Sequence, residues 1–285
     1  MLAKVATSRS GSCFARSPGE RWVEIWDLTS HDFLAALDTS LDPGGDRFAI
    51  SPDGSQLLVG AYRRAGLALY QLLDGTVAWR RKDVTRTQVI DLSADGKTAY
   101  ITRQDAPAFV IDVDTGDTLD HLSDAQAVST AHGGRRCVVA THRDYYWLNG
   151  EGIALRAGQR PGTFLDAACG TGRLYLSEAT GLLRVVDLGS SQEIRTIAPP
   201  DDSHWVKVSC VGDSDELVMV RYDFGEARVF LDHLSASTGI TCQVGELEAG
   251  QYSFGANGSL LIGSRGDLRR ADNGSLLTRF EWRHP

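Results

Sequence analysis

Two short stretches decide the fold: Phe48-Ala49-Ile50-Ser51-Pro52-Asp53-Gly54 and Val89-Ile90-Asp91-Leu92-Ser93-Ala94-Asp95-Gly96. Each is an apolar strand followed by a small turn that ends in Gly, and a second apolar strand comes next in both places. The same pattern recurs along the whole chain. Its turn positions, which are 38 to 44 residues apart, are Gly11, Gly54, Gly96, Gly134, Gly172, Ser214 and Gly258.

A repeat of about 40 residues that is built from short strands is typical of propeller blades. We therefore predict an all-β chain that folds as a single seven-bladed β-propeller of four-stranded antiparallel blades, with the innermost strands lining a central channel. No stretch shows sustained helical periodicity, and no linker is long enough to separate two domains. The predicted blades of this one domain, 1–285, cover approximately residues 1–40, 46–82, 87–122, 126–157, 163–198, 204–244 and 250–285.

The composition is that of an ordinary globular chain, with 42% hydrophobic and 23% charged residues among 285. The apolar runs have only strand length, and the first residues lack the pattern of a signal peptide. The five cysteines include no Cys-x-x-Cys pair, so we expect reduced thiols and a cytoplasmic location. The net charge of −8 disfavours nucleic acid and anionic membranes as partners and favours a basic protein partner.

Side chains that would mark an enzyme are not grouped in the sequence. The seven histidines show no metal-binding spacing, there is no Gly-x-Ser-x-Gly elbow, and Gly170-Thr171-Gly172 is too short to cradle a phosphate. We therefore expect no catalytic residue, no metal and no cofactor. Two alternatives stay open: a propeller hydrolase or lactonase with a metal in the channel, and a propeller that binds a small ligand at the channel mouth.

Several motifs carry a family resemblance. The dipeptide Trp26-Asp27, the stretch 92–102 and the stretch 110–116 resemble the repeats of WD-repeat propellers and of their bacterial relatives, the YVTN-type propellers. This resemblance implies the fold and a binding role, and it transfers no functional residue. The segment 74–79 resembles the tryptophan-docking motif of quinoprotein propellers, which implies that Trp79 packs between blades. We also expect the ring to close by packing of the first blade on the last, without exchange of strands.

One face of the predicted propeller has the composition of a protein interface. Loops after the second strand open on this face, and in six blades they carry Arg16, Arg63, Arg103, Arg143, Arg221 and Arg265. Arginine mixed with carboxylates and aromatic rings is typical of protein-binding surfaces. The alternative is that Arg and Asp pair within each loop and only solvate it. The predicted partner-binding residues are Tyr62, Arg63, Arg64, Arg103, Arg143, Tyr145, Arg221 and Tyr222.

Arg63 and Arg64 are favoured among them, because their loop has no acidic residue. Taken together, these features predict a non-catalytic protein–protein interaction module. It would act as a scaffold subunit, or as an inhibitor or immunity-type protein that caps a protein partner.

Overall fold

The computed structural model consists of short β-strands that follow one another along the chain. It describes residues 4–8, 10–17, 22–39, 47–61, 66–93, 95–103, 106–122, 125–130, 137–141, 144–148, 154–159, 164–187, 189–190, 192–212, 214–235, 237–255 and 258–281. Between residues 122 and 164 the description covers the backbone and not the side chains. No helix long and apolar enough to cross a bilayer is found among these residues.

The strands follow one another at short intervals, and each has four to eight residues. They are β1 (Lys4–Thr7), β2 (Cys13–Ser17), β3 (Trp22–Asp27), β4 (Phe33–Asp38), β5 (Arg47–Ile50), β6 (Gln56–Gly60), β7 (Leu67–Gln71), β8 (Val77–Arg81), β9 (Thr87–Leu92), β10 (Thr98–Arg103), β11 (Ala106–Asp112), β12 (Thr118–Leu122), β13 (Ala125–Thr130) and β14 (Cys137–Thr141). The second half of the chain adds β15 (Asp144–Leu148), β16 (Ala154–Gln159), β17 (Phe164–Cys169), β18 (Arg173–Glu178), β19 (Leu183–Asp187), β20 (Glu193–Ile197), β21 (Ser203–Cys210), β22 (Leu217–Asp223), β23 (Arg228–Leu234), β24 (Thr241–Leu247), β25 (Tyr252–Gly255), β26 (Leu260–Gly263), β27 (Asp267–Arg270) and β28 (Leu276–Arg279).

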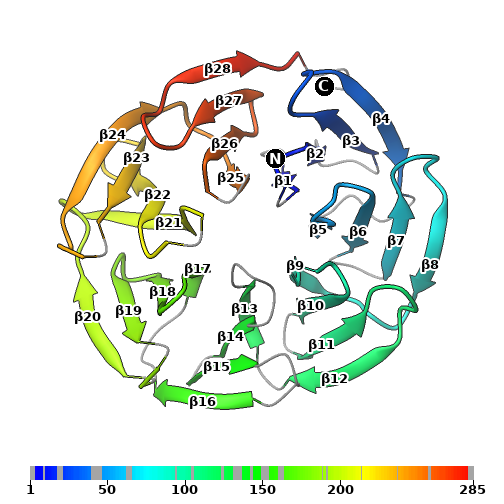
Figure 1. Ribbon diagram of the computed structural model, residues 1–285, viewed down its shortest axis with the longest axis horizontal. Coiled ribbons are helices and arrows are strands. Elements are labelled where there is room, and N and C mark those ends of the chain that lie inside the picture. Colours follow the sequence, from blue (N-terminus) through cyan, green and yellow to red (C-terminus); the bar gives the residue numbers. More distant parts are fainter. Residues whose placement is uncertain are drawn as a thin grey trace.

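Each group of four consecutive strands forms one antiparallel sheet, from β1–β4 round to β25–β28, and the sheets stand in a ring (Figure 1). The first strand of each sheet lies innermost and the fourth lies at the rim (Figure 1). The prediction of an all-β propeller with four-stranded antiparallel blades is therefore confirmed. The sixth sheet extends beyond the predicted limits, because β24 runs past Val244 to Leu247.

The predicted count of seven blades has to be corrected to six for the blades whose packing the structure describes. Six sheets are described with their side chains, namely β1–β12 and β17–β28. The sheet of β13–β16 is described by its backbone pairing alone. The blade packing described below is therefore the packing of six blades.

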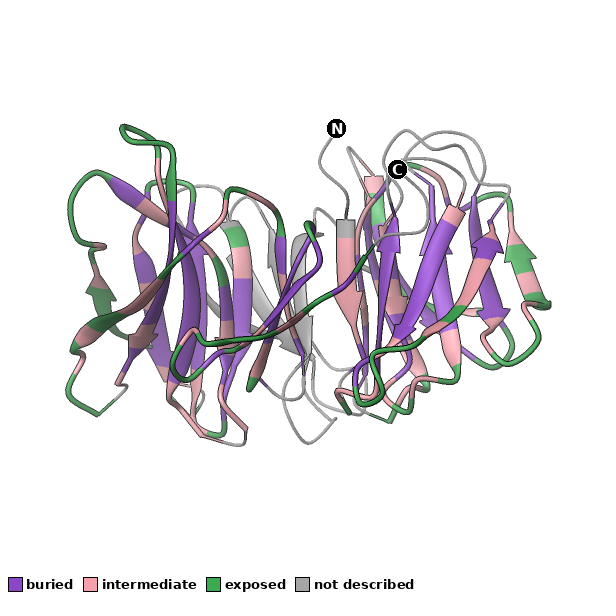
Figure 2. Ribbon diagram, turned by 90° about the horizontal axis from the view of Figure 1, so that it is seen from above, coloured by how far each residue is buried: buried purple, intermediate pink, exposed green. Residues whose placement is uncertain are grey.

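The hydrophobic core lies between neighbouring blades. One cluster joins Val23 and Ile25 of the first sheet to Leu57 and Val59 of the second. Each of the other described clusters also takes its members from two adjacent sheets. The faces of each sheet are buried in this way while the rim and the two ring faces stay exposed (Figure 2).

The outer strand of one blade docks on a turn of the next. A Cβ atom added at Gly116, whose φ is +77°, would lie 2.8 Å from Cδ2 of Trp79, so the indole ring needs a glycine there. Trp79 Nε1 also donates a hydrogen bond to the Val113 carbonyl oxygen at 2.8 Å. The packing of Trp79 between blades is thus confirmed. The described docking pairs are Leu37 with Gly75, Trp79 with Gly116, Arg195 with Gly239, and Phe280 with His31.

The ring closes where the first sheet meets the last. Phe14 and Trp26 of the first sheet pack on Phe280, with ring centroids 4.7 and 5.5 Å apart. The Thr7 hydroxyl donates a hydrogen bond to the Phe254 carbonyl oxygen at 2.6 Å. Every described strand of these two sheets pairs within its own sheet, which confirms the expected closure by packing.

The repeated turn has a simple physical cause. Ser51 Oγ donates to Asp53 Oδ1, which also accepts the backbone N–H of Ser55, and Ser51 Oγ accepts the N–H of Gln56. Gly54 completes the turn because its φ of +80° disfavours residues with a Cβ atom. The later turn 93–98 repeats the same bonds.

Candidate functional site

Loops between second and third strands leave the ring on the same side as the blade-to-blade connections, because adjacent strands are antiparallel. We call this side the loop face. Its described segments are 82–86, 179–182, 198–202, 224–227, 248–251 and 264–266. Of the predicted partner-binding residues, Arg103, Arg221 and Tyr222 lie near the ends of β10 and β22 beneath this face.

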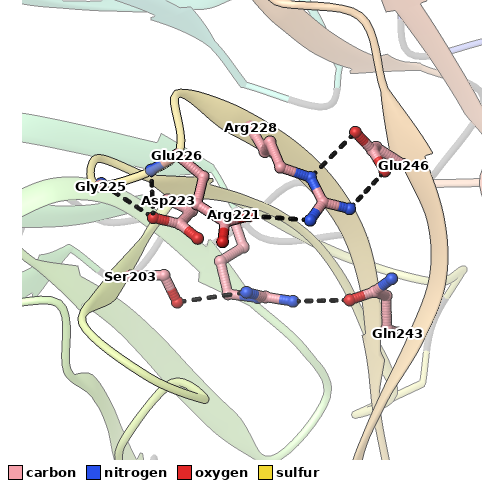
Figure 3. Close-up of polar contacts among 8 residues, drawn as sticks. All are labelled: Ser203, Arg221, Asp223, Gly225, Glu226, Arg228, Gln243 and Glu246. Atoms are coloured by element: carbon pink, nitrogen blue, oxygen red, sulfur yellow. Dashed lines mark hydrogen bonds and ion pairs between the residues drawn. The ribbon is translucent and has the colours of Figure 1, made fainter.

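Arg221, a predicted partner contact, lies inside the sixth blade, where its side chain is engaged by the fold. Its side chain is 4% exposed, and its Nε donates to Asp232 Oδ2 at 2.6 Å. Its remaining nitrogens reach Ser203 Oγ at 3.3 Å and Gln243 Oε1 at 3.0 Å (Figure 3). A buried guanidinium must be paired in this way, because an unpaired charge is costly to remove from water.

Two more arginines of the predicted ring serve the fold. Arg16 is buried and donates to Glu24 Oε2 at 3.2 Å, and burial lowers the pKa of its guanidinium. Arg103 donates from Nε to the Thr85 carbonyl oxygen at 2.8 Å, so it ties β10 to the preceding blade connection. Burial lowers the pKa of Arg103 as well. A contact of Arg103 with a partner stays a prediction.

Arg265 is the exposed member of the described part of the ring. Its Nη1 lies 3.5 Å from Glu248 Oε2, and Glu248 also pairs with Arg279. The Arg279 hydrogen bond, more than any other contact, lowers the pKa of Glu248. Exposed pairs of this kind contribute little to stability, so they leave the surface free to exchange partners.

The remaining predicted contacts are not tested by the described residues. Tyr62, Arg63, Arg64 and Arg143 lie outside them. Tyr145 belongs to β15, and its side chain is also outside the description. These five residues stay predictions.

Tyr222 belongs to an aromatic patch on the loop face, which we define as His204, Tyr222 and Phe224. The Phe224 ring lies 4.7 Å from the Tyr222 ring and 4.9 Å from the His204 ring. Phe224 is 60% exposed although it is a large apolar side chain. The turn of the fifth blade touches the same patch, since a Cβ atom at Gly181 would lie 3.1 Å from His204 Cδ2.

The hairpin between β22 and β23 holds Phe224 outward. Asp223 Oδ1 accepts the backbone N–H groups of Gly225 at 2.9 Å and Glu226 at 3.1 Å, which fixes the turn (Figure 3). Arg228 then anchors the far side of the hairpin by pairing with Glu226 and Glu246 (Figure 3). The hairpin is therefore ordered by its own polar contacts and does not need to bury Phe224.

Carboxylates border the aromatic patch. Asp201 and Asp202 are exposed in the connection that leads into β21. The last pair of the β21–β22 ladder joins Ser203 to Asp223, so Asp202 and Phe224 leave that ladder at the same end. Glu226 follows Phe224 by two residues in the same hairpin. The patch thus combines aromatic rings with negative charge.

Sequence reasoning missed His204 and Asp232 as members of this region. The alternative of pairing within each loop would join Arg221 to Asp223, but Asp223 caps its own turn and Asp232 takes the guanidinium. The usable signal was strand pairing: Arg221 is opposite Phe230, and Asp232 is two residues further along the same strand. His204 pairs with Tyr222 in the same way across β21 and β22.

The central channel of the ring is a second candidate site. Its cavity of about 650 Å³ is lined by the innermost strands, including Phe48, Asp91, Asp166 and Lys207. Lys207 Nζ lies 3.6 Å from Asp166 Oδ1, and Asp166 Oδ2 accepts the N–H of Val208 at 3.0 Å. Charged and apolar groups therefore meet inside the ring.

Metal-ligating side chains and thiols are spread over the described part of the chain. Among the described residues no group of three or more His, Cys, Asp and Glu side chains is close enough to hold a metal ion. Cys13, Cys169 and Cys210 are buried free thiols as expected, whereas Cys242 is exposed. The side chain of Cys137 lies outside the described residues. Burial raises the pKa of the Cys13 and Cys210 thiols.

Comparisons with known proteins agree with this fold. No protein-family profile and no curated protein sequence matches the chain. Among solved structures, the chain is similar to the β-propeller domain of Cps50 (Swd1) from Myceliophteria thermophila, with a TM-score of 0.72 and 13% sequence identity. The match covers 96% of this chain and 95% of that chain. At this identity the likeness concerns the fold, so the β-propeller implied by the WD-repeat and YVTN resemblance is confirmed, while membership of either family stays a prediction.

Proposed function

We propose that the protein is a non-catalytic protein–protein interaction module that binds its partner through the loop face. It serves as a scaffold subunit or as an inhibitor that caps the partner. The observation that carries this proposal is the aromatic patch, in which Phe224 is 60% exposed on an ordered hairpin. Aromatic side chains of this kind are enriched at the centres of protein interfaces.

The energy available at this patch is large enough to matter. A phenylalanine buries about 150–250 Å² when it is fully covered, so covering the exposed part of Phe224 removes on the order of 100 Å² from water. At about 25 cal/mol per Å² this contributes roughly 2.5 kcal/mol to binding. The rest of the interface would come from the surrounding loops, and the acidic border favours a basic partner.

The test uses two exposed apolar residues on opposite faces. Phe224→Ser removes the centre of the patch, whereas Leu73→Ser removes a side chain that is 99% exposed in a turn between third and fourth strands. The tagged chain and both variants are used to capture partners from an extract of the source cells. A partner retained by wild type and Leu73→Ser but lost by Phe224→Ser supports the proposal, and a partner lost equally from both variants contradicts it.

The central cavity favours small-ligand binding as a second candidate function. Its volume and its Lys207–Asp166 pair fit a small polar molecule. A rise in melting temperature with a library of sugars and organic acids would support this function. The rise should disappear in Lys207→Met, since that variant loses the channel cation that pairs with Asp166.

A further inference from the structure

Phenylalanine rings in this protein repeatedly hold a guanidinium. Two arginines lie over the Phe230 ring, with Cζ of Arg221 at 4.4 Å and Cζ of Arg228 at 4.8 Å from its centroid. Each of these arginines also pairs with a carboxylate, Asp232 or Glu246. The unit is therefore a ring face, a cation above it and a carboxylate beside the cation.

A second copy of this unit occurs in the third blade. Phe109 has Cζ of Arg103 at 4.9 Å and Cζ of Arg81 at 5.8 Å from its ring centroid. Arg81 is held by Asp83, whose hydrogen bonds with it raise the pKa of the guanidinium. A cation above an aromatic face is attracted by the ring quadrupole, and a carboxylate holds it in place.

Phe224 offers a ring of this kind near the exposed Asp202, which leaves the β21–β22 ladder at the same end, and no described cation lies over the ring. Among the described residues, the aromatic rings that pack on it are those of Tyr222 and His204, in tilted and edge-on geometries. Asp201 and Asp202 are exposed, and no described cation pairs with either of them. The nearest guanidinium in the hairpin, Arg228, is already engaged by Glu226, Glu246 and Phe230.

We infer that the aromatic patch receives a cationic side chain, arginine or lysine, from a basic segment of the partner. The cation stacks on Phe224 and pairs with Asp202 at the mouth of the β21–β22 ladder. This inference rests on the proposed function and deepens it, because it names the chemistry that the loop face recognises. Arginine fits better than lysine, since its planar guanidinium both stacks and forms paired hydrogen bonds with a carboxylate.

The test measures binding of defined peptides by fluorescence anisotropy. The probes are a short fluorescein-labelled Gly-Ser peptide with arginine at alternate positions and the same peptide with lysine or with neutral citrulline. We expect the arginine peptide to bind more tightly than the lysine peptide and the citrulline peptide not to bind. Phe224→Leu keeps the apolar side chain but loses the ring, and it should weaken binding about threefold to tenfold.

Two further variants control for charge and for folding. Asp202→Asn should weaken the arginine peptide, whereas Asp74→Asn, the same charge change in an exposed turn on the opposite face, should not. Phe224→Trp should tighten binding, because the indole face attracts cations more strongly. A gain in this variant cannot come from a failure to fold.

Two results would overturn the inference. Equal losses in Asp202→Asn and Asp74→Asn would reduce the binding to general attraction by an acidic chain, and an unchanged affinity in Phe224→Leu would remove the role of the ring. The proposed function is tested apart from this. If a captured partner depends on Phe224 but the arginine peptide does not displace it, the interaction module stands and the cation inference is wrong. If the peptide binds at Phe224 and no protein is captured, the cation inference stands and the interaction module is unsupported.

Discussion

Replacing Arg221 by Ala would leave a carboxylate without its counter-ion inside the sixth blade. Asp232 has a relative exposure of 0%, and its Oδ2 lies 2.6 Å from Arg221 Nε. Removing one partner of a buried ion pair costs about 3–5 kcal/mol, because the other charge stays out of water. We expect the free energy of unfolding of Arg221→Ala to fall by that amount. For a chain of this size, the melting temperature should drop by roughly 6–20 °C.

Urea unfolding followed by tryptophan fluorescence measures this loss directly. Trp205 is a suitable reporter, since its Nε1 donates to Asp232 Oδ2 at 3.0 Å and it is fully buried. The double variant Arg221→Met/Asp232→Leu removes both charges and should recover most of the stability. Arg228→Ala is the matched control, because its ion pairs are exposed and its loss should change stability far less.

The same variant separates a structural arginine from a binding one. Partner binding per folded molecule should be unchanged in Arg221→Ala at temperatures where the variant is folded. If Arg221→Ala unfolds at the same urea concentration as wild type but no longer binds the partner, then Arg221 acts at the interface and the argument from its burial is wrong.

Three further predictions concern the blades and their turns. Gly116→Ala places a Cβ atom 2.8 Å from Trp79 Cδ2 at a φ of +77°, so it should lower the free energy of unfolding by about 1–3 kcal/mol in the urea assay. Gly225→Ala is the control, because its Cβ atom would lie 3.4 Å from the nearest atom, and it should lower that free energy less. The Ser51 hydroxyl and the Ser55 N–H lower the pKa of Asp53 below its unfolded value. The contribution of Asp53 to stability is therefore complete above about pH 4 and is lost as the pH falls further. Between neutral and acidic pH, the melting temperature of Asp53→Asn should fall less than that of wild type. Alkylation by iodoacetamide, mapped by mass spectrometry, should modify exposed Cys242 before buried Cys13 and Cys210, and faster labelling of Cys210 would contradict its placement between blades.

The fold could be predicted from the sequence because its repeat is local. The Ser-x-Asp-Gly turn at 51–54 forms its hydrogen bonds within six residues, so composition and spacing identify it. Trp79 could be placed between blades for a related reason, since its motif includes its own turn at 74–75. Strand order and ring closure then follow from the repetition of one unit along the chain.

The site depends on contacts between strands, and these are harder to predict. Arg221 and Asp223 are close in sequence, yet Arg221 pairs with Asp232 on the facing strand. The sequence around an arginine at the end of a strand therefore does not show whether its side chain is buried or exposed. The exposure of Phe224 depends on how Asp223 fixes the hairpin, which composition does not show.

The placement of the core between blades has a consequence for how the protein unfolds. A linear array of repeats has two end units that can fray, because each end unit has one neighbour. In this ring the contact of Phe280 with Phe14 and His31 gives the first and last blades a second neighbour each. A crack at any boundary would convert the ring into an open array with two new ends. We therefore expect the closure contact to make unfolding cooperative around the whole circle, so that weakening it lowers the protection of amide hydrogens in distant blades as well as in adjacent ones.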